Sequence, residues 1–536
     1  MKIPGRKFPD GAEPAVTAWG DGKRKVIHDK MFVEMNEEKQ QLKYGAIISY
    51  IAIFINTATA LVYIPWMARK LGKSDYGLYT LAFSFVNFFL VDFGLSAAVS
   101  RFVAKYRAEH DEQSANKLVG TVTKMYLAID VLLAIVMVVV YFLIDKIFVG
   151  LTPREVETFK PLFLIMAGYS LFSLPFLSLP GILTAYEKFV QLKLCDLAQK
   201  LLTVALIIVA IRSGLGVAWV LAANIVGGIL CIFAKLYFVR RDTPIRIDWS
   251  GHSSALLQSV LAFSVWTTVI SIAERSIFNL APTILGITAN SDEIALFAPA
   301  NSLEGYFYMF AAAVNGLFLA RISRYIANRE EDRIFSLMVN VGRYQLAVMG
   351  LIFIGFLCLG DDFMSLWMGR EYHGAALCAI LMFVPDLLLF TQQIANDTVI
   401  AKNEVKHMAY ANIGMAVICV GLSFPLSSRY GALGSSIAIA VSYMFTFVYM
   451  NIVYYRRLNI DVFEFFRQCY SSFLVPYGIT IVLSFLILPN IEIYGWGGLL
   501  TKAFVISAIY FTLIWSLALR DDEKKLITSR ISGKSR

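Results

Sequence analysis

The sequence has few charged residues for its length. Of its 536 residues, 16% are charged and 58% are hydrophobic, whereas soluble domains carry about 25% charged residues. This composition excludes a water-soluble globule and predicts a membrane protein.

A nucleotide-binding loop is also absent. The one Gly-Lys-Ser sequence, Gly533–Ser535, lies at the end of the chain. A phosphate-binding loop needs a glycine five residues before this Gly-Lys, and Thr528 occupies that position. The sequence therefore carries no recognisable ATPase.

Histidines and cysteines are too scattered for a metal centre. None of the five histidines belongs to an HExxH motif, and none of the six cysteines forms a CxxC pair. The loops predicted to face the outside are short, and the longest, around 145–160, offers little room for a catalytic centre. We therefore expect no enzyme, no metal site and no cofactor.

Long hydrophobic runs are abundant instead. A membrane-spanning helix needs about 20 apolar residues. Residues 1–43 are polar and basic without an apolar core, so we expect no cleaved signal peptide before the first run. We predict fourteen spans, at 44–67, 77–100, 118–144, 161–185, 190–211, 216–239, 254–286, 294–320, 335–359, 374–401, 408–427, 432–455, 471–489 and 497–519.

The distribution of basic residues predicts the orientation. If the N-terminus lies inside, the inner segments carry 34 of the 48 Lys and Arg residues. Cytoplasmic loops hold this excess in membrane proteins, so we expect both termini in the cytoplasm. The first outer loop is an exception, with Arg69, Lys70 and Lys73. These side chains either reach lipid headgroups or meet an anionic ligand.

The chain repeats a short phrase. Residues 100–104 read SRFVA and residues 323–327 read SRYIA, each a few residues after a Gly-Leu pair. Leu71-Gly72 and Leu285-Gly286 form a second, weaker echo upstream. The two phrases end the second and eighth predicted spans. They favour two similar halves in one membrane, an arrangement typical of transporters whose path lies between the halves.

Several charged residues fall inside the predicted spans, where a charge is costly unless it faces a cavity or a partner. Asp196 and Lys200 are four residues apart and are spaced to pair on one helix face. In the tenth span, Asp386, Gln393 and Asp397 align on one face of a helix that Pro385 is expected to bend. The charged residues are Asp92, Lys124, Asp130, Asp196, Lys200, Glu274, Arg275, Glu304, Asp386 and Asp397.

Two interpretations of these polar residues stay open. The first is hydrogen bonding between helices, which holds the bundle together. The second is a polar cavity, in which Arg275, Lys124 and Lys200 attract a phosphate or an acidic sugar. Glu304, Asp386 and Asp397 would then bind a proton or Na⁺ and couple transport to an ion gradient. Further candidates for the cavity wall are Asn56, Asn301 and Tyr308.

The stretch from Arg69 to Ala82, RKLGKSDYGLYTLA, resembles a signature of bacterial polysaccharide flippases, as does Asp92-Phe93-Gly94-Leu95 running into Ser100-Arg101-Phe102. These proteins are the O-antigen and repeat-unit translocases of the multidrug/oligosaccharidyl-lipid/polysaccharide exporter superfamily. The resemblance is most specific over 44–110. Its signature positions are Leu71, Gly72, Tyr76, Gly77, Tyr79, Asp92, Gly94 and Arg101.

This resemblance implies an all-α polytopic fold of about 14 helices. Two six-helix lobes would be related by a pseudo-twofold axis along the membrane normal and followed by two further helices. The implied parts are a basic cytoplasmic arm (1–43), an N-lobe (44–240), a cytoplasmic linker (241–253), a C-lobe (254–455), the two extra helices (456–519) and a cytoplasmic tail (520–536).

The resemblance also implies a function. The substrate would be an oligosaccharide repeat unit on a polyprenyl pyrophosphate, flipped from the inner to the outer leaflet of the bacterial cytoplasmic membrane by alternating access. Its partners would be membrane lipids, a polysaccharide polymerase and glycosyltransferases, without nucleic acid. The candidate list holds three basic residues against seven acidic ones, which suits an anionic substrate poorly. An ion-coupled multidrug or cation exporter and a flippase of a lipid-linked peptidoglycan precursor therefore remain as alternatives.

Overall fold

A computed structural model describes residues 54–55, 57–249, 254–312 and 318–531. The predicted arm at 1–43, the candidate Asn56 and part of the predicted linker lie outside the described residues, as does the Glu274 side chain. Residues 57–71 are helical and precede α2.

The described residues form helices and contain no strand. The elements are α2 (Lys73–Phe89), α3 (Leu95–Ala108), α4 (Glu112–Ile147), α5 (Pro153–Ser173), η1 (Leu174–Ser178), α6 (Leu179–Ala185), α7 (Phe189–Arg212), α8 (Val217–Asp242), α9 (Ser254–Thr288), α10 (Ser291–Ala312), α11 (Leu319–Ala327), α12 (Glu331–Trp367), η2 (Arg370–Tyr372), α13 (Ala375–Phe390), α14 (Gln393–Ala401), α15 (Lys406–Leu458), α16 (Val462–Ile487), η3 (Leu488–Asn490), α17 (Gly495–Leu513), η4 (Ile514–Ala518) and α18 (Asp521–Ile531).

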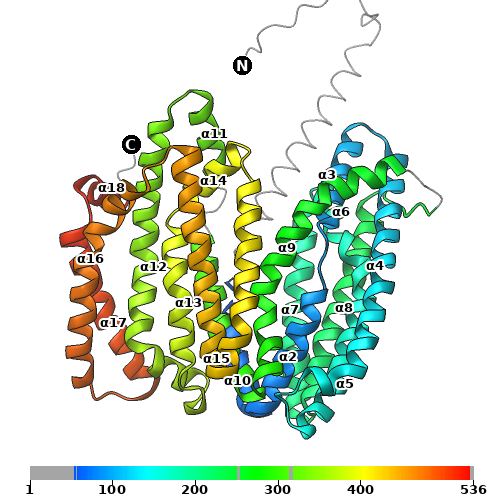
Figure 1. The fold of residues 1–536 in the computed structure, drawn as a ribbon, viewed down its shortest axis with the longest axis horizontal. Helices are drawn as coiled ribbons and strands as arrows, with labels where there is room; N and C mark the ends of the chain where they lie inside the picture. Colours follow the sequence, from blue (N-terminus) through cyan, green and yellow to red (C-terminus); the bar gives the residue numbers. More distant parts are fainter. Residues whose placement is uncertain (1–53, 56, 250–253, 313–317, 532–536) are drawn as a thin grey trace, which may run out of the picture.

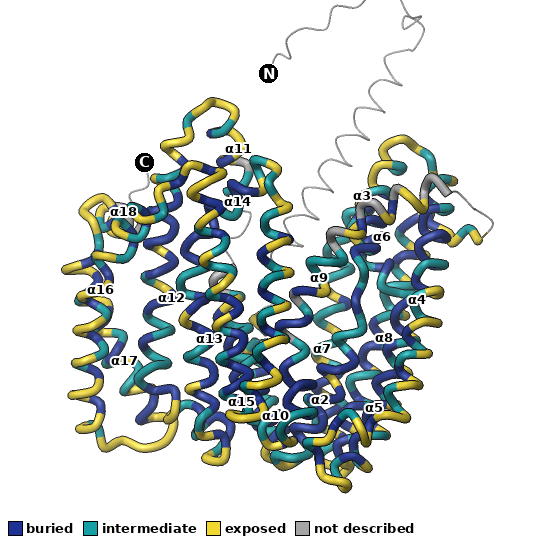
Figure 2. The backbone as a smooth tube through the Cα atoms, in the orientation of Figure 1, coloured by how far each residue is buried: buried dark blue, intermediate teal, exposed yellow. Residues whose placement is uncertain are grey.

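Many of these helices are long and apolar enough to cross a membrane. Within the described residues eight helices qualify singly, and α13 and α14, bent by 51° at their junction, qualify together as a ninth. Figure 2 shows exposed positions along α4, and between Leu127 and Leu143 the exposed side chains are all apolar, as a surface in contact with lipid requires. The expected all-α multi-pass membrane fold is confirmed, whereas the count of fourteen spans stays a prediction.

Helix α15 covers two of the predicted spans. Gly431 has a φ of 55°, outside the helical region, and the chain folds back there. The hydroxyls of Ser427 and Ser435 lie 2.8 Å apart across the turn. Farther from the turn, the Phe445 ring packs against Gly414, so the two arms of α15 lie side by side.

The helices form two lobes that meet at one end and diverge at the other (Figure 1). One buried apolar cluster runs through both lobes and includes residues of α2, α5, α10, α13 and α15. Each lobe has a second cluster of its own, around α3, α4 and α6 in one lobe and around α11, α12, α14 and α16 in the other. Helix α9 packs against α15 and α10 on one side and against α2 and α3 on the other, and so connects the lobes.

The repeated phrase occupies equivalent positions in the two lobes. SRFVA lies on α3, which follows α2 after a break at 90–94, and SRYIA lies on α11, the next described helix after α10. Each of these short helices packs against another interrupted helix, α3 against α6 and α11 against α14. The similarity between the halves therefore extends from the sequence to the packing of these short helices.

The end at which the lobes meet is closed by hydrogen bonds as well as by apolar packing. The Arg69 guanidinium donates to the carbonyls of Leu366 (2.6 Å), Trp367 (3.0 Å) and Met368 (3.2 Å), the last residues of α12. The indole of Trp367 donates in turn to the Leu61 carbonyl at 2.6 Å. Arg69 therefore caps a helix C-terminus, where a cation is favourable, instead of reaching a headgroup or a ligand.

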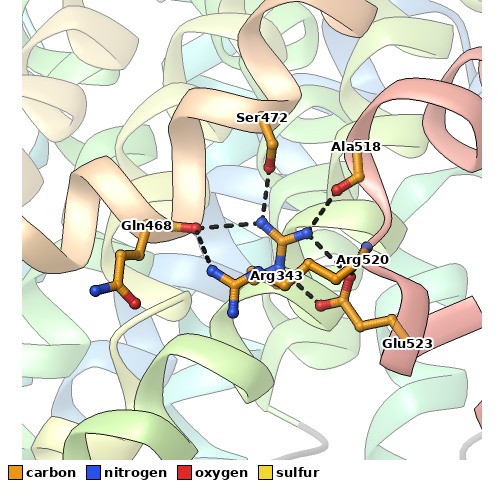
Figure 3. Close-up of polar contacts among 6 residues, drawn as sticks. All are labelled: Arg343, Gln468, Ser472, Ala518, Arg520 and Glu523. Carbon is orange, nitrogen blue, oxygen red and sulfur yellow. Dashed lines mark hydrogen bonds and ion pairs between the residues drawn. The ribbon is translucent and has the colours of Figure 1, made fainter.

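A buried ion pair attaches the tail helix α18 to the second lobe (Figure 3). The Arg343 guanidinium of α12 donates to both carboxylate oxygens of Glu523, at 2.7 and 2.9 Å. Its other N–H groups donate to Ser472 Oγ and to the carbonyls of Ala518 and Gln468. Because all these bonds are made, the cost of burying the two charges is offset.

Candidate functional site

A cavity of about 560 Å³ lies within the first lobe, and Arg275 of α9 forms part of its lining. Helix 57–71 and helices α2, α5, η1, α6, α7 and α8 form the remainder of its wall. The polar and charged side chains in its lining are Tyr63, Asn87, Tyr169, Ser173, Asp196, Gln199, Lys200, Thr203, Asn224, Lys235 and Arg275. Two of the predicted substrate residues, Lys200 and Arg275, therefore come together here from helices that are remote in sequence.

The cavity carries a positive charge. Lys235 forms an ion pair with Asp196 at 2.8 Å, so the predicted pair of Asp196 with Lys200 is wrong. Lys200 Nζ instead lies 5.7 Å from the centre of the Tyr63 ring, within reach of a cation–π interaction. Three cations against one carboxylate leave a net positive charge in the lining.

Arg275 is held at the junction of α9 and α2. Its guanidinium donates to the Asn87 carbonyl at 2.5 Å, near the end of α2. The Asp92 carboxylate interacts with it and also accepts hydrogen bonds from backbone N–H groups at the start of α3. This arrangement places the Arg275 guanidinium of α9 next to the break between α2 and α3.

Lys235 falls inside the predicted span at 216–239, close to its end, but is not among the charged residues that the sequence analysis selected. Helix α8 continues to Asp242, and Lys235 is in the cavity lining. The apolar residues that follow this lysine, Leu236, Tyr237, Phe238 and Val239, indicate that the helix continues beyond it.

The remaining predicted wall residues lie apart from this cavity. Lys124 donates to the Trp249 carbonyl at 2.6 Å, in the segment that leads to α9. Tyr308 of α10 packs edge-on against Phe390 at 5.0 Å. Asn301 is half-buried on the same helix. None of the three is in the cavity lining.

A second group of polar side chains lies in the other lobe. Glu304 of α10 and Asp386 of α13 are buried and their carboxyl groups interact. The Tyr443 hydroxyl of α15 donates to Glu304 at 3.3 Å. Among the described residues, no basic side chain pairs with either carboxyl.

The predicted polar stripe of the tenth span is interrupted. Helix α13 ends at Phe390 and α14 begins at Gln393, so Asp386 and Asp397 belong to two helices bent by 51°. The bend therefore lies several residues beyond Pro385, where it was expected. Between the two helices, Gln392 donates to the Asn451 side chain of α15 at 2.7 Å, which is a contact that holds helices together.

The signature residues act mainly through packing and backbone shape. A Cβ at Gly77 would collide with the Ser291 carbonyl, so this glycine permits the close approach of α2 to α10. Gly72 and Gly94 have φ of 87° and 67° at the ends of α2 and α3. Tyr79 accepts a hydrogen bond from Asn224 in the cavity lining. Of the others, Tyr76 is buried and Leu71 packs against the same core, whereas Arg101 is exposed.

Comparisons with known proteins place this geometry in a family. Residues 42–319, more than half of the chain, match the family described as polysaccharide biosynthesis protein. A Shigella flexneri protein named as a candidate O-antigen transporter is 22% identical over 425 residues, which are 76% of this chain and 96% of that protein.

Two solved structures have the same fold. A lipid II flippase MurJ in an inward closed conformation has a TM-score of 0.68 at 14% identity and covers 87% of this chain and 98% of its own. An inward-facing multidrug resistance MATE family transporter of the MOP superfamily has a TM-score of 0.63 at 16% identity, over 78% of this chain and 99% of its own. The chain belongs to the polysaccharide biosynthesis protein family.

Proposed function

We propose that this protein translocates a polyprenyl-pyrophosphate-linked oligosaccharide from the inner to the outer leaflet of the bacterial cytoplasmic membrane for cell-surface polysaccharide biosynthesis. The observation that carries the proposal is the cationic cavity with Lys200, Lys235 and Arg275 in its wall. An Arg fork and two ammonium groups are suited to a diphosphate. The family and the named relative support a substrate of this class.

The cavity removes the main difficulty raised by the sequence, the excess of acidic residues. Of the acidic side chains in the spans that the structure describes, Asp196 is in the cavity lining and is paired with Lys235, and Asp92 interacts with Arg275. Glu304 and Asp386 lie in the other lobe. A cationic drug would meet net positive charge in this cavity, which favours the flippase over the cation exporter. The MurJ-like fold leaves a lipid-linked peptidoglycan precursor as the second candidate substrate.

The proposed cycle is alternating access of the two lobes. The lobes diverge on the side that carries α3 and α11 (Figure 1), where the basic loops after each repeated phrase lie. We assign this side, with both termini, to the cytoplasm, following the excess of Lys and Arg. The sugar and diphosphate head of the substrate would enter from the cytoplasmic side, where it is assembled. The closed end near Arg69 would open after the lobes move.

Glu304 and Asp386 are the proposed coupling pair. Two carboxylates in one water-poor pocket repel each other unless a proton or a cation lies between them. Binding of H⁺ or Na⁺ here would therefore change the interaction between α10 and α13, which belong to the lobe that must move. Coupling by this pair is independent of the identity of the sugar.

The test of the cavity is binding of a polyprenyl diphosphate to purified Arg275→Ala, Arg275→Lys and Lys200→Gln variants. Loss of one charge-assisted hydrogen bond should weaken binding by about tenfold or more. Arg275→Lys should retain part of the affinity, because it keeps the charge and loses the fork. Unchanged affinity in both Arg275→Ala and Lys200→Gln would exclude this cavity as the diphosphate site.

A further inference from the structure

A second hollow lies directly beside the cationic cavity. It is a groove of about 500 Å³ between helix 57–71 and α7. One wall is formed by Val62, Tyr63 and Trp66, and the other by Val204, Ile208 and Arg212. Ala58 and Thr59 complete the lining, which is apolar or aromatic apart from Thr59 and Arg212, in contrast to the charged lining of the cavity.

The two hollows share part of their wall. Tyr63 and Val204 line both of them. On α7, Lys200, Val204, Ile208 and Arg212 follow one another at intervals of four residues, so they lie along one face of the helix. From Lys200 to Arg212 this face extends for roughly 18 Å along the helix axis. A path therefore leads from the cation in the cavity along α7 and past Val204 into the groove.

Tyr63 stands at the boundary between the two environments. Its hydroxyl is hydrogen-bonded to Tyr79, which accepts a second hydrogen bond from Asn224 at 3.2 Å. Its ring lies beneath Lys200 Nζ. The ring thus presents a polar edge and a cation on the cavity side and an apolar surface on the groove side.

We propose that this groove holds the polyprenyl chain of the lipid-linked substrate while its diphosphate lies in the cavity near Lys200. The inference rests on the proposed function and adds the route by which the lipid part leaves the cavity. An isoprenoid chain in a polar cavity would be exposed to water, at a cost of about 0.8 kcal/mol for each CH₂ group. A slot between helix 57–71 and α7 avoids this cost, because the chain stays in contact with the hydrocarbon of the membrane.

The occupant follows from the chemistry at the two ends of the path. A membrane phospholipid fits the groove alone, but its phosphate would have no reason to lie at Lys200, inside the first lobe. A molecule with a diphosphate joined directly to a long apolar chain satisfies both parts at once. The groove therefore fits a polyprenyl diphosphate better than an ordinary lipid.

Photocrosslinking tests the groove. A benzophenone amino acid would replace Val62 in the groove, the cavity-lining Leu177, or Phe142 on the lipid-facing side of α4, in full-length protein incubated with radiolabelled polyprenyl diphosphate. Val62 and Phe142 are 75% and 74% exposed, so they are matched in accessibility to lipid. We expect Val62 to capture severalfold more label than Phe142. Excess unlabelled polyprenyl diphosphate should remove the difference, whereas polyprenol without phosphates should not, and Lys200→Gln should reduce capture about tenfold.

The outcomes separate this inference from the proposed function. Equal capture at Val62 and Phe142, with capture at Leu177 intact, would overturn the groove and leave the flippase in place. Displacement of the label by phospholipid as readily as by polyprenyl diphosphate would also overturn it. Absence of capture at all three positions, together with absence of transport, would remove both proposals.

Two neighbouring residues on α7 give an independent test. Ile208 is half-buried in the lining of the groove and is absent from the lining of the cavity, whereas Val209 is 61% exposed outside both linings. Ile208→Trp should block the groove and abolish transport of the lipid-linked substrate, while affinity for inorganic pyrophosphate in the cavity is retained. Val209→Trp should transport normally. Normal transport by folded Ile208→Trp would contradict a route between these helices.

Discussion

Among the described side chains, Arg343 is the largest that the fold buries completely. Its guanidinium joins α12 to α16 through Ser472 and to the tail through Glu523, and it also lies 5.2 Å from the centre of the Phe473 ring. A charge in this position is stable only while every partner is present. The tail helix α18 is therefore part of the folded unit of the second lobe.

This buried pair gives a prediction about stability. Arg343→Ala leaves the Glu523 carboxylate buried without its partner and should lower the free energy of unfolding by about 3–5 kcal/mol. Thermal unfolding of the purified protein in detergent measures the effect. The control is Arg467→Ala, which removes an exposed pair with Glu464 and should leave the stability nearly unchanged. Equal effects of the two substitutions would show that the Arg343 pair does not anchor the tail.

The sequence predicted individual polar residues better than their partners. Lys200 and Arg275 were identified because charges are rare in membrane spans, and both are in the cavity lining. Spacing along one helix suggested Lys200 as the partner of Asp196, but Lys235 on the neighbouring α8 is the actual one. Such pairs depend on which helix faces which, and the periodicity of one helix carries no information about that.

At the scale of helices, the closed end of the molecule depends on a small set of hydrogen bonds. Helix 57–71 is joined to the C-terminus of α12 through Arg69 and through the Trp367 indole. Near them, Ser74 and Ser291 both donate to the Glu155 carboxylate, which connects the starts of α2 and α10 to α5. These bonds must break before the lobes can separate at this end.

Removal of the Arg69 contact should favour the state in which this end is open. Hydrogen bonds to a charged donor contribute about 1.5–3 kcal/mol each, so Arg69→Gln should shift the equilibrium by tenfold or more. Spin labels at Val149 and Tyr494, one in each lobe near the closed end, report the separation by electron–electron resonance. The distribution should move to longer distances in Arg69→Gln and stay unchanged in Lys70→Gln, whose side chain is the exposed neighbour. The same distribution in both variants would argue against a latch.

Helix types were predictable, but helix ends and breaks were not. Long apolar runs predicted helices such as α4 and α12 because composition alone decides them, although α12 spans Glu331–Trp367 instead of 335–359. The break between α13 and α14 is accompanied by a tertiary contact. The buried Thr391 hydroxyl lies 2.7 Å from the Tyr470 hydroxyl of α16, a contact that sequence spacing does not reveal.

At the scale of the whole molecule, the two lobes carry different chemistry. The first lobe holds the cationic cavity, whereas the second holds the buried pair of Glu304 and Asp386. The sequence contained both sets of charges but could not separate them, because the separation follows from the positions of α7, α8 and α10 in space. This division permits substrate binding and ion binding to occur in different lobes of one protein.

The division predicts that coupling can be lost without loss of binding. Glu304→Gln or Asp386→Asn should remove the dependence of transport on a pH or Na⁺ gradient, because a neutral amide cannot exchange a proton or a cation in the pocket. Affinity for polyprenyl diphosphate should change by less than about threefold, because substitutions at distant sites usually act independently. Transport rates in proteoliposomes with and without each gradient measure the effect, with Asp145→Asn, an exposed residue paired with Lys160, as control. Gradient dependence that survives both substitutions would exclude the pair from coupling.

The central claim is that the cationic cavity carries the diphosphate of a lipid-linked sugar across the membrane. The most direct measurement places a short polyprenyl-diphosphate oligosaccharide in the inner leaflet of proteoliposomes and follows its appearance outside with a glycosidase. We predict appearance that depends on the protein and is slowed by about tenfold or more in Lys200→Gln and Arg275→Ala, each of which loses a charge-assisted bond to the diphosphate. Failure of the folded protein to move any lipid-linked sugar, together with uptake or export of a cationic dye by the same vesicles, would contradict the account.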